Sequence, residues 1–215
     1  MANKYDLVLL DLDGTVADTD ELILTTMNIL FDKYRNGQRT PAEVVYYYSG
    51  PPIRGSLAHE FPDRDPDEMV KEFAVISWDL YDTCVDVFPH VRETLISLKN
   101  RGIKLGIVTT KAHNSTIKCL TSLKIIELIP DFVAKEDVTN GKPDPEGIFK
   151  MMEHFAVKDK KKVLYVGDNK GDYLAARNAG VDSGMVTWGP RKIDRTLTPE
   201  YWIDDFADLE GIVNE

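Results

Sequence analysis

Residues 7–15 read LVLLDLDGT, and this stretch decides how the rest of the chain is interpreted. Four apolar residues that run into polar ones are typical of a buried parallel strand, and ligands of open α/β sheets bind just beyond such strand ends. Asp11 and Asp13 are two positions apart, so an extended chain places both carboxylates on the same side. Their repulsion needs a cation or a shared proton to compensate, which indicates a functional site. The alternative is an ordinary strand-to-turn junction, where Asp and Gly are common turn residues.

The composition indicates an ordinary globular protein. The chain has 215 residues, 43% of them hydrophobic and 29% charged, which suits one large domain or a core with a modest insertion. Its net charge of -10 disfavours nucleic acid and anionic membrane surfaces as partners. Any site for a phosphate group must therefore be locally positive.

Cysteine content and hydropathy bear on the compartment. Cys84 and Cys119 form no disulfide framework and lack metal-ligand spacing, as expected in a reducing compartment. The N-terminal apolar stretch is short and ends at Asp11, unlike a signal peptide, and no segment reaches the roughly 20 apolar residues that span a bilayer. We therefore expect a cytoplasmic location and no membrane partner, while the oligomeric state is not predicted.

The segment 16–85 predicts helices and no strand. Apolar residues recur at helical spacing over 23–34, and Thr40-Pro41-Ala42-Glu43 has the form of a capping box with proline at the first helical position. Asp65-Pro66 opens a longer helix by the same logic.

From residue 86 onward, strands and helices alternate. The predicted strands cover residues 103–108, 131–133, 163–166 and, as the last one, 184–186. Such alternation gives a parallel sheet covered on both faces. The predicted fold is therefore α/β: a Rossmann-like three-layer parallel-sheet core of residues 1–15 and 86–215, with a small all-helical cap domain, residues 16–85, inserted after the first strand.

Polar side chains follow several of these strands. Because the carboxyl ends of parallel strands meet at one edge of a sheet, we expect them to share one crevice. Carboxylates suit Mg²⁺, threonine and lysine can hold phosphoryl oxygens, and an ionised aspartate can attack phosphorus to give an aspartyl-phosphate. The residues concerned are Asp11, Asp13, Thr109, Thr110, Lys111, Lys142, Asp168 and Asp172.

Four motifs in chain order resemble those of the haloacid dehalogenase superfamily. They are Asp11-Leu12-Asp13-Gly14-Thr15, Val108-Thr109-Thr110, Lys142-Pro143, and Gly167-Asp168 followed by Asp172. The resemblance spans nearly the whole chain and is closest to the phosphoglycolate phosphatase and pyrophosphatase-like branch, whose members carry a helical cap between the first two motifs. Asn169, where relatives often have serine, and His90, where many have glycine, depart from the pattern and leave the motifs intact.

The resemblance implies a role for each motif residue in catalysis. Asp11 would be the nucleophile, and Asp13 would be the general acid for the leaving group and then the base for the hydrolytic water. The transferring phosphoryl group would be bound by Thr109, Thr110 and Lys142.

The resemblance also implies a metal site. Mg²⁺ would be bound by the Asp11 carboxylate, the Asp13 backbone carbonyl and Asp168, with Asp172 acting behind these ligands or through a metal-bound water. We therefore expect a Mg²⁺-dependent phosphatase that hydrolyses a small phosphorylated metabolite, a phosphoglycolate-like monoester or pyrophosphate, through an aspartyl-phosphate. A phosphomutase of the β-phosphoglucomutase type and a non-catalytic regulatory protein on the same fold are the alternatives.

The cap is expected to recognise the leaving group. Residues 49–56, SGPPIRGS, interrupt two predicted cap helices with a rigid loop. Its arginine, Arg54, has a planar fork that suits a carboxylate or a second phosphate. We expect Arg54 to bind such a group on the substrate; a solvated surface arginine is the alternative.

Overall fold

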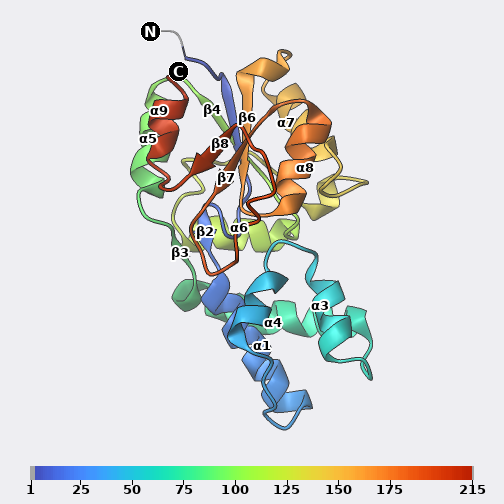
Figure 1. The fold of residues 1–215 in the computed structure, drawn as a ribbon. Helices are drawn as coiled ribbons and strands as arrows, with labels where there is room; N and C mark the ends of the chain where they lie inside the picture. The colour runs from blue at the N-terminus through green and yellow to red at the C-terminus, as the bar shows by residue number, and fades with distance from the viewer. Residues whose placement is uncertain (1–2, 215) are drawn as a thin grey trace.

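The computed structural model describes residues 3–214 of the chain. Its centre is a sheet of six strands, in which every neighbouring pair is parallel (Figure 1). In spatial order the strands are β5 (Phe132–Val133), β4 (Lys104–Val108), β1 (Leu7–Leu10), β6 (Val163–Gly167), β7 (Asp182–Val186) and β8 (Tyr201–Ile203). The predicted α/β fold with a parallel sheet is confirmed.

Helices cover both faces of the sheet, because each strand alternates its side chains between two apolar cores. Val8 and Leu10 pack with α5 (Val91–Asn100), α6 (His113–Ser122) and α9 (Asp208–Ile212). Leu7 and Leu9 pack with α7 (Glu146–His154) and α8 (Lys170–Ala179). Figure 1 shows α5 and α9 on one side of the sheet and α7 and α8 on the other.

A helical insertion follows β1 and lies beyond the carboxyl edge of the sheet (Figure 1). Its core is built from apolar side chains of four helices, among them Met27, Leu30, Phe31 and Leu57. The elements are α1 (Asp20–Tyr34), α2 (Ala42–Val45), the 3-10 turn η1 (Tyr46–Tyr48), α3 (Ile53–Glu60) and α4 (Pro66–Cys84). The inserted helical cap is confirmed, while its division from the core at residues 16 and 85 stays a prediction.

Capping residues were predicted for two helices of the insertion, and only one of the two predictions is confirmed. Asp65 caps α4 as expected, because its side chain accepts hydrogen bonds from the amides of Asp67 and Glu68. The expected capping box at Thr40 is wrong. The Thr40 hydroxyl donates instead to Glu60 at 2.8 Å, so it ties the start of α2 to the end of α3.

Three short strands differ from prediction, and two 3-10 turns complete the fold. The prediction of no strand between residues 16 and 85 is wrong, because β2 (Ala17–Asp18) pairs antiparallel with β3 (Asp86–Val87) where the chain enters and leaves the insertion. The prediction that residues 184–186 form the last strand is also wrong, because β8 follows at the sheet edge. Segments of two or three residues are too short to show an alternating pattern. The 3-10 turns are η2 (Lys135–Asp137) and η3 (Lys160–Lys162).

Within residues 3–214, the structure contains no helix that is both long and apolar enough to cross a membrane.

Candidate active site

Asp11 is the first residue beyond β1, and its carboxylate lies on the side of the sheet covered by α7 and α8. The alternation that sends Leu7 and Leu9 to this face sends Asp11 there too. Asp11 is only 2% exposed. Burial raises the pKa of its carboxyl group, the charge of Lys142 opposes that rise, and the carboxylate of Asp172 adds to it. The residue expected to be the nucleophile is thus held at the base of the site.

Lys142 lies between two buried carboxylates. Its Nζ atom donates hydrogen bonds to Oδ1 of Asp11 and to Oδ1 of Asp172, both at 2.6 Å, and to the Val108 carbonyl at 3.3 Å. Burial works to lower the pKa of Lys142, but the charges of Asp11 and Asp172 outweigh it and raise the pKa well above its usual range. Lys142 therefore stays a cation beside Asp11, and its phosphoryl-binding role stays a prediction.

Asp172, in the first turn of α8, uses both carboxylate oxygens within the protein. Its Oδ1 atom accepts hydrogen bonds from Lys142 and from the Tyr165 hydroxyl, the latter at 3.0 Å. Its Oδ2 atom accepts from the amides of Asp168 and Asn169, both at 3.2 Å. Asp172 therefore positions Lys142 and the chain at Asp168.

Asp168 follows β6 and completes a cluster of carboxylates. Single oxygen atoms of Asp11, Asp168 and Asp172 lie within 4.8 Å of one another, an arrangement that could hold a metal ion. Asp168 accepts hydrogen bonds from the Asn169 side chain at 3.0 Å and from Nε of Arg191 at 2.9 Å. Burial raises the pKa of the Asp168 carboxyl group to about 6, with Asp172 adding to the rise and Arg191 opposing it.

The charge and space in this cluster fit a divalent cation. Its ion pairs join four buried carboxylates to two cations, and so leave an excess of negative charge. The carboxylates are those of Asp11, Asp20, Asp168 and Asp172, and the cations are Lys142 and Arg191. Oxygen ligands with excess negative charge suit Mg²⁺. Gly14, with φ +83°, leaves room beside the site, because a Cβ atom there would be 2.4 Å from Oδ2 of Asp168.

Asp13 is buried with a separate set of partners. Nζ of Lys111 donates to its two carboxylate oxygens at 2.8 and 2.9 Å, and the Thr19 hydroxyl donates to Oδ1 at 2.8 Å. The Asp13 side chain is thus turned toward Lys111, and its main-chain carbonyl is the atom left for the expected metal contact.

The two threonines after β4 differ in their surroundings. The Thr109 hydroxyl accepts a hydrogen bond from the Lys111 amide at 3.1 Å and keeps its own proton to donate. The Thr110 hydroxyl instead donates to the carbonyl of Gly50 in the cap at 2.5 Å. The Thr110 side chain therefore links the core to the cap, and only its main chain is left for the expected phosphate contact.

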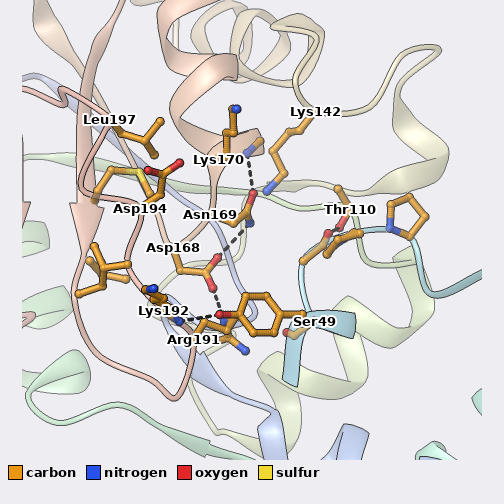
Figure 2. Close-up of a pocket in the computed structure, with 18 of the residues that line it drawn as sticks. Ser49, Thr110, Lys142, Asp168, Asn169, Lys170, Arg191, Lys192, Asp194 and Leu197 are labelled. Carbon is orange, nitrogen blue, oxygen red and sulfur yellow. Dashed lines mark hydrogen bonds and ion pairs between the residues drawn. The ribbon is translucent and has the colours of Figure 1, made fainter. Parts of the chain in front are cut away.

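Two cavities lie between cap and core, separated by the cap loop at residues 49–52, which lines both of them. The first, of about 430 Å³, is lined by Lys142, Asp168, Lys170 and Arg191 (Figure 2). The second, of about 150 Å³, is lined by charged groups of both domains. Those groups are Asp13, Arg54, Lys111 and Lys135.

Arg54 lies at the wall of the second cavity but makes its contacts within the cap. Its Nε atom donates to Oδ1 of Asp67 at 2.7 Å, and its side chain is 54% exposed. Both the predicted ligand-binding role and the surface-arginine alternative are compatible with this placement, because the ion pair with Asp67 is open to solvent.

Two residues of the site, Tyr165 and Arg191, had no role in the sequence interpretation. Lys111 was expected in the same crevice from its place after a strand end, but its ion pair with Asp13 was not predicted. Tyr165 lies within the apolar run of β6, and its hydroxyl donates a hydrogen bond to Asp172. Arg191 lies in the loop between β7 and β8, and nothing local in the sequence signals a partner so distant along the chain.

Comparisons with known proteins show similarity along most of the chain. The family model of haloacid dehalogenase-like hydrolases matches residues 8–186. The chain is 35% identical over 212 residues to pyrophosphatase PpaX of Halalkalibacterium halodurans, covering 98% of this chain and 97% of the relative. It is 31% identical over 213 residues to PpaX of Bacillus cereus, covering 98% and 97%.

Solved structures share the fold. A haloacid dehalogenase-like hydrolase from Bacteroides fragilis superposes with a TM-score of 0.84 at 25% identity, over 96% of this chain and all of that one. A predicted phosphoglycolate phosphatase from Haemophilus somnus gives a TM-score of 0.87 at 23% identity, over 97% and 98%.

The chain belongs to the haloacid dehalogenase-like hydrolases. Within that family it is a phosphatase related to the PpaX pyrophosphatases, with an acidic cluster suited to a divalent metal and a phosphorylated small molecule as substrate.

Proposed function

We propose that this protein is a Mg²⁺-dependent phosphatase that hydrolyses a small phosphorylated metabolite through an aspartyl-phosphate on Asp11. The observation that carries the proposal is the 2.6 Å contact between Asp11 and Lys142, inside the carboxylate cluster with Asp168. A nucleophile beside a buried cation is what in-line attack on a phosphoryl group requires.

The substrate phosphoryl group would be held by Lys142, the Thr109 hydroxyl and the main-chain amide of Thr110. Lys142 neutralises the charge that develops on the phosphoryl oxygens, and Asp172 keeps Lys142 in place. Asp11 and Asp168, with the Asp13 carbonyl, would bind Mg²⁺, which supplies charge that keeps Asp11 ionised and screens it from the incoming phosphoryl oxygens.

Asp13 would carry the proton. It would first give a proton to the leaving-group oxygen and then take one from the water that hydrolyses the aspartyl-phosphate. Lys111 and Thr19 fix the orientation of the Asp13 carboxylate, so the Asp13 carboxyl group can serve in both proton transfers.

The second cavity is where the leaving group would lie. Asp13 faces it, and Lys111, Arg54 and Lys135 give its wall positive charge. The Ser49 hydroxyl, in the loop between the two cavities, is buried without a hydrogen-bond partner among the described residues and could donate to a substrate oxygen. These groups favour a leaving group with its own negative charge, so we propose pyrophosphate or a phosphoglycolate-like monoester as substrate. The names of the PpaX relatives agree with the former.

The test is a release assay for phosphate with purified protein. Pyrophosphate, phosphoglycolate and an aryl phosphate without a second charged group are each supplied with Mg²⁺ and with excess chelator. Asp11→Asn serves as the blank. We expect metal-dependent turnover of all three, with the highest kcat/KM on pyrophosphate or phosphoglycolate, whose leaving groups carry their own negative charge. Turnover that survives exhaustive chelation would contradict the metal, and no turnover of any substrate would favour a non-catalytic protein.

A further inference from the structure

Arg191 contacts the metal cluster and the cap with a single guanidinium group. Its Nε atom donates to Oδ2 of Asp168 at 2.9 Å, and its Nη1 atom donates to Oδ1 of Asp20 at 2.6 Å and to the Tyr46 carbonyl at 3.0 Å. Asp168 belongs to the core, whereas Asp20 begins α1 and Tyr46 begins η1 in the cap. Figure 2 shows Arg191 beside Asp168 in the wall of the first cavity.

The Arg191 side chain is enclosed, so the bridge is part of the built site. It is 9% exposed. Its Nη2 atom lies so close to the main chain that a Cβ atom on Gly14 would be 2.5 Å from it. A guanidinium keeps its charge and its fork geometry at every accessible pH, so the two carboxylates have a permanent common partner. The neighbouring amide of Lys192 adds a hydrogen bond to the Tyr47 hydroxyl at 2.9 Å on the cap side.

The charges of the cluster do not require Arg191 to leave when a divalent cation binds. The excess of negative charge in the cluster persists with Arg191 counted, so the cation need not displace the guanidinium to find compensation. A cation on Asp168 would fix that carboxylate in one orientation. Ordering one partner of a bridge lowers the entropy cost of the other, which couples the two ends.

We propose that Arg191 is a positioning residue that couples metal binding at Asp168 to closure of the cap. The inference rests on the proposed function, since it requires a divalent cation at the carboxylate cluster. Through Arg191, metal binding stabilises the closed position of η1 and the start of α1, and cap closure in turn steadies the metal ligand.

Hydrogen exchange of the cap amides at residues 46–49, measured with and without Mg²⁺, tests the coupling, and Mg²⁺ binding is measured separately by calorimetry. In the wild-type protein we expect Mg²⁺ to slow this exchange by about fivefold or more, the lower end of typical coupling between sites. Arg191→Met removes both the charge and the planar group that binds two carboxylates. Arg191→Lys keeps the charge but cannot bind both carboxylates in the same geometry. Both variants should exchange faster and lose the response to Mg²⁺ while still binding the ion. Lys192→Ala, next in the same loop, is the matched control and should respond as the wild type does.

The outcomes separate this inference from the proposed function. Mg²⁺ binding without any change in cap exchange, or an unchanged response in Arg191→Met, would overturn the coupling and leave the metal site standing. Faster exchange on adding Mg²⁺ would show that the ion displaces Arg191, and would also overturn it. Absence of Mg²⁺ binding in the wild-type protein would overturn both the inference and the proposed metal.

Discussion

Asp11 and Asp13 stand two positions apart in the sequence, yet their carboxylates have different partners. Asp11 contacts Lys142 and belongs to the carboxylate cluster, where a metal and a phosphoryl group would meet. Asp13 contacts Lys111 and Thr19 at the wall of the second cavity, where a leaving group would depart. In the proposed mechanism one aspartate would be the nucleophile and the other the proton carrier, because the environment of each carboxylate decides which atoms it can reach.

Replacing the nucleophile is the first prediction at this scale. Asp11→Asn keeps the volume and removes the attacking charge, so kcat should fall by about a thousandfold or more, the usual cost of losing a nucleophile. Steady-state kinetics on an aryl phosphate measures it, and a circular dichroism spectrum controls for folding. Activity above about a hundredth of the wild-type value would reassign the nucleophile.

At the scale of elements, the loop that presents Lys142 depends on the start of α7. Glu146, the first residue of this helix, accepts hydrogen bonds from the amides of Thr139 and Asn140 and pairs with Lys150 at 2.9 Å. The hydrogen bond from Lys150, followed by those from the two amides, lowers the pKa of Glu146 from 4.5 to about 2. A helix N-terminus favours such an acidic side chain.

This lowered pKa predicts a pH dependence of stability. A carboxyl group whose pKa is lower in the folded state stabilises the fold above its unfolded pKa and loses that contribution as the pH falls toward the folded pKa. The melting temperature of the wild type should therefore exceed that of Glu146→Gln at pH 6, and the difference should shrink as the pH falls below 4.5 toward 2. Glu153→Gln, on the same helix, is the control. A difference that does not vary with pH would show that Glu146 acts through packing alone.

The elements also show what the sequence could and could not predict. The strands that end just before Asp11, Thr109 and Asp168 were predictable, because each is an apolar run followed abruptly by polar residues. The pairing of β2 with β3 was not, because two-residue strands have no periodicity and their contact joins segments far apart in the chain. The contacts of Arg191 were not predictable either, because its three partners are far from it in the sequence.

A local signal failed at Thr40, where a competing partner was available. Thr40 had the spacing of a helix cap, but Glu60 from α3 binds its hydroxyl. The motif around Thr110 likewise did not show that its hydroxyl donates to Gly50 of the cap, while its phosphate contact stays a prediction. Hydroxyl groups serve backbone and tertiary partners equally well, so their partners follow from the folded chain and not from the motif.

For the whole molecule, the division of labour between core and cap predicts where selectivity resides. Arg54 lines the second cavity from the cap side and forms an exposed ion pair with Asp67, which we expect it to exchange for a substrate anion. Arg54→Ala should lower kcat/KM on the preferred substrate by about tenfold or more, the effect of losing a charged hydrogen bond, and leave an aryl phosphate without a second charged group nearly unaffected. The measurement is kcat/KM on both substrates.

The control for this variant is Arg39→Ala, which removes another cap arginine, paired with Asp32 at 2.8 Å. Equal losses on both substrates in Arg54→Ala would indicate a folding or closure effect. No loss on either would make Arg54 a surface residue.

The choice of metal is also a property of the assembled molecule, because the ligands proposed for it come from two different strand ends. Mg²⁺, and Mn²⁺ with similar oxygen ligation, should support turnover. Ca²⁺ should inhibit, because its larger and looser coordination shell would misplace the phosphoryl group relative to Asp11. Activity titrations with each ion after chelation test this, and full activity with Ca²⁺ alone would contradict the geometry proposed for Asp11 and Asp168.

The central claim is that Asp11 carries the phosphoryl group during turnover, and acid-quench trapping tests it most directly. A radiolabelled aryl phosphate is mixed with Asp13→Ala, quenched in acid and digested. An aryl leaving group needs no proton, so the aspartyl-phosphate should still form, and without the base its hydrolysis should be slow. We predict that the label accumulates on the peptide containing Asp11, and that Asp11→Asn traps none. Label on another residue, or label trapped in Asp11→Asn but not in Asp13→Ala, would contradict the account.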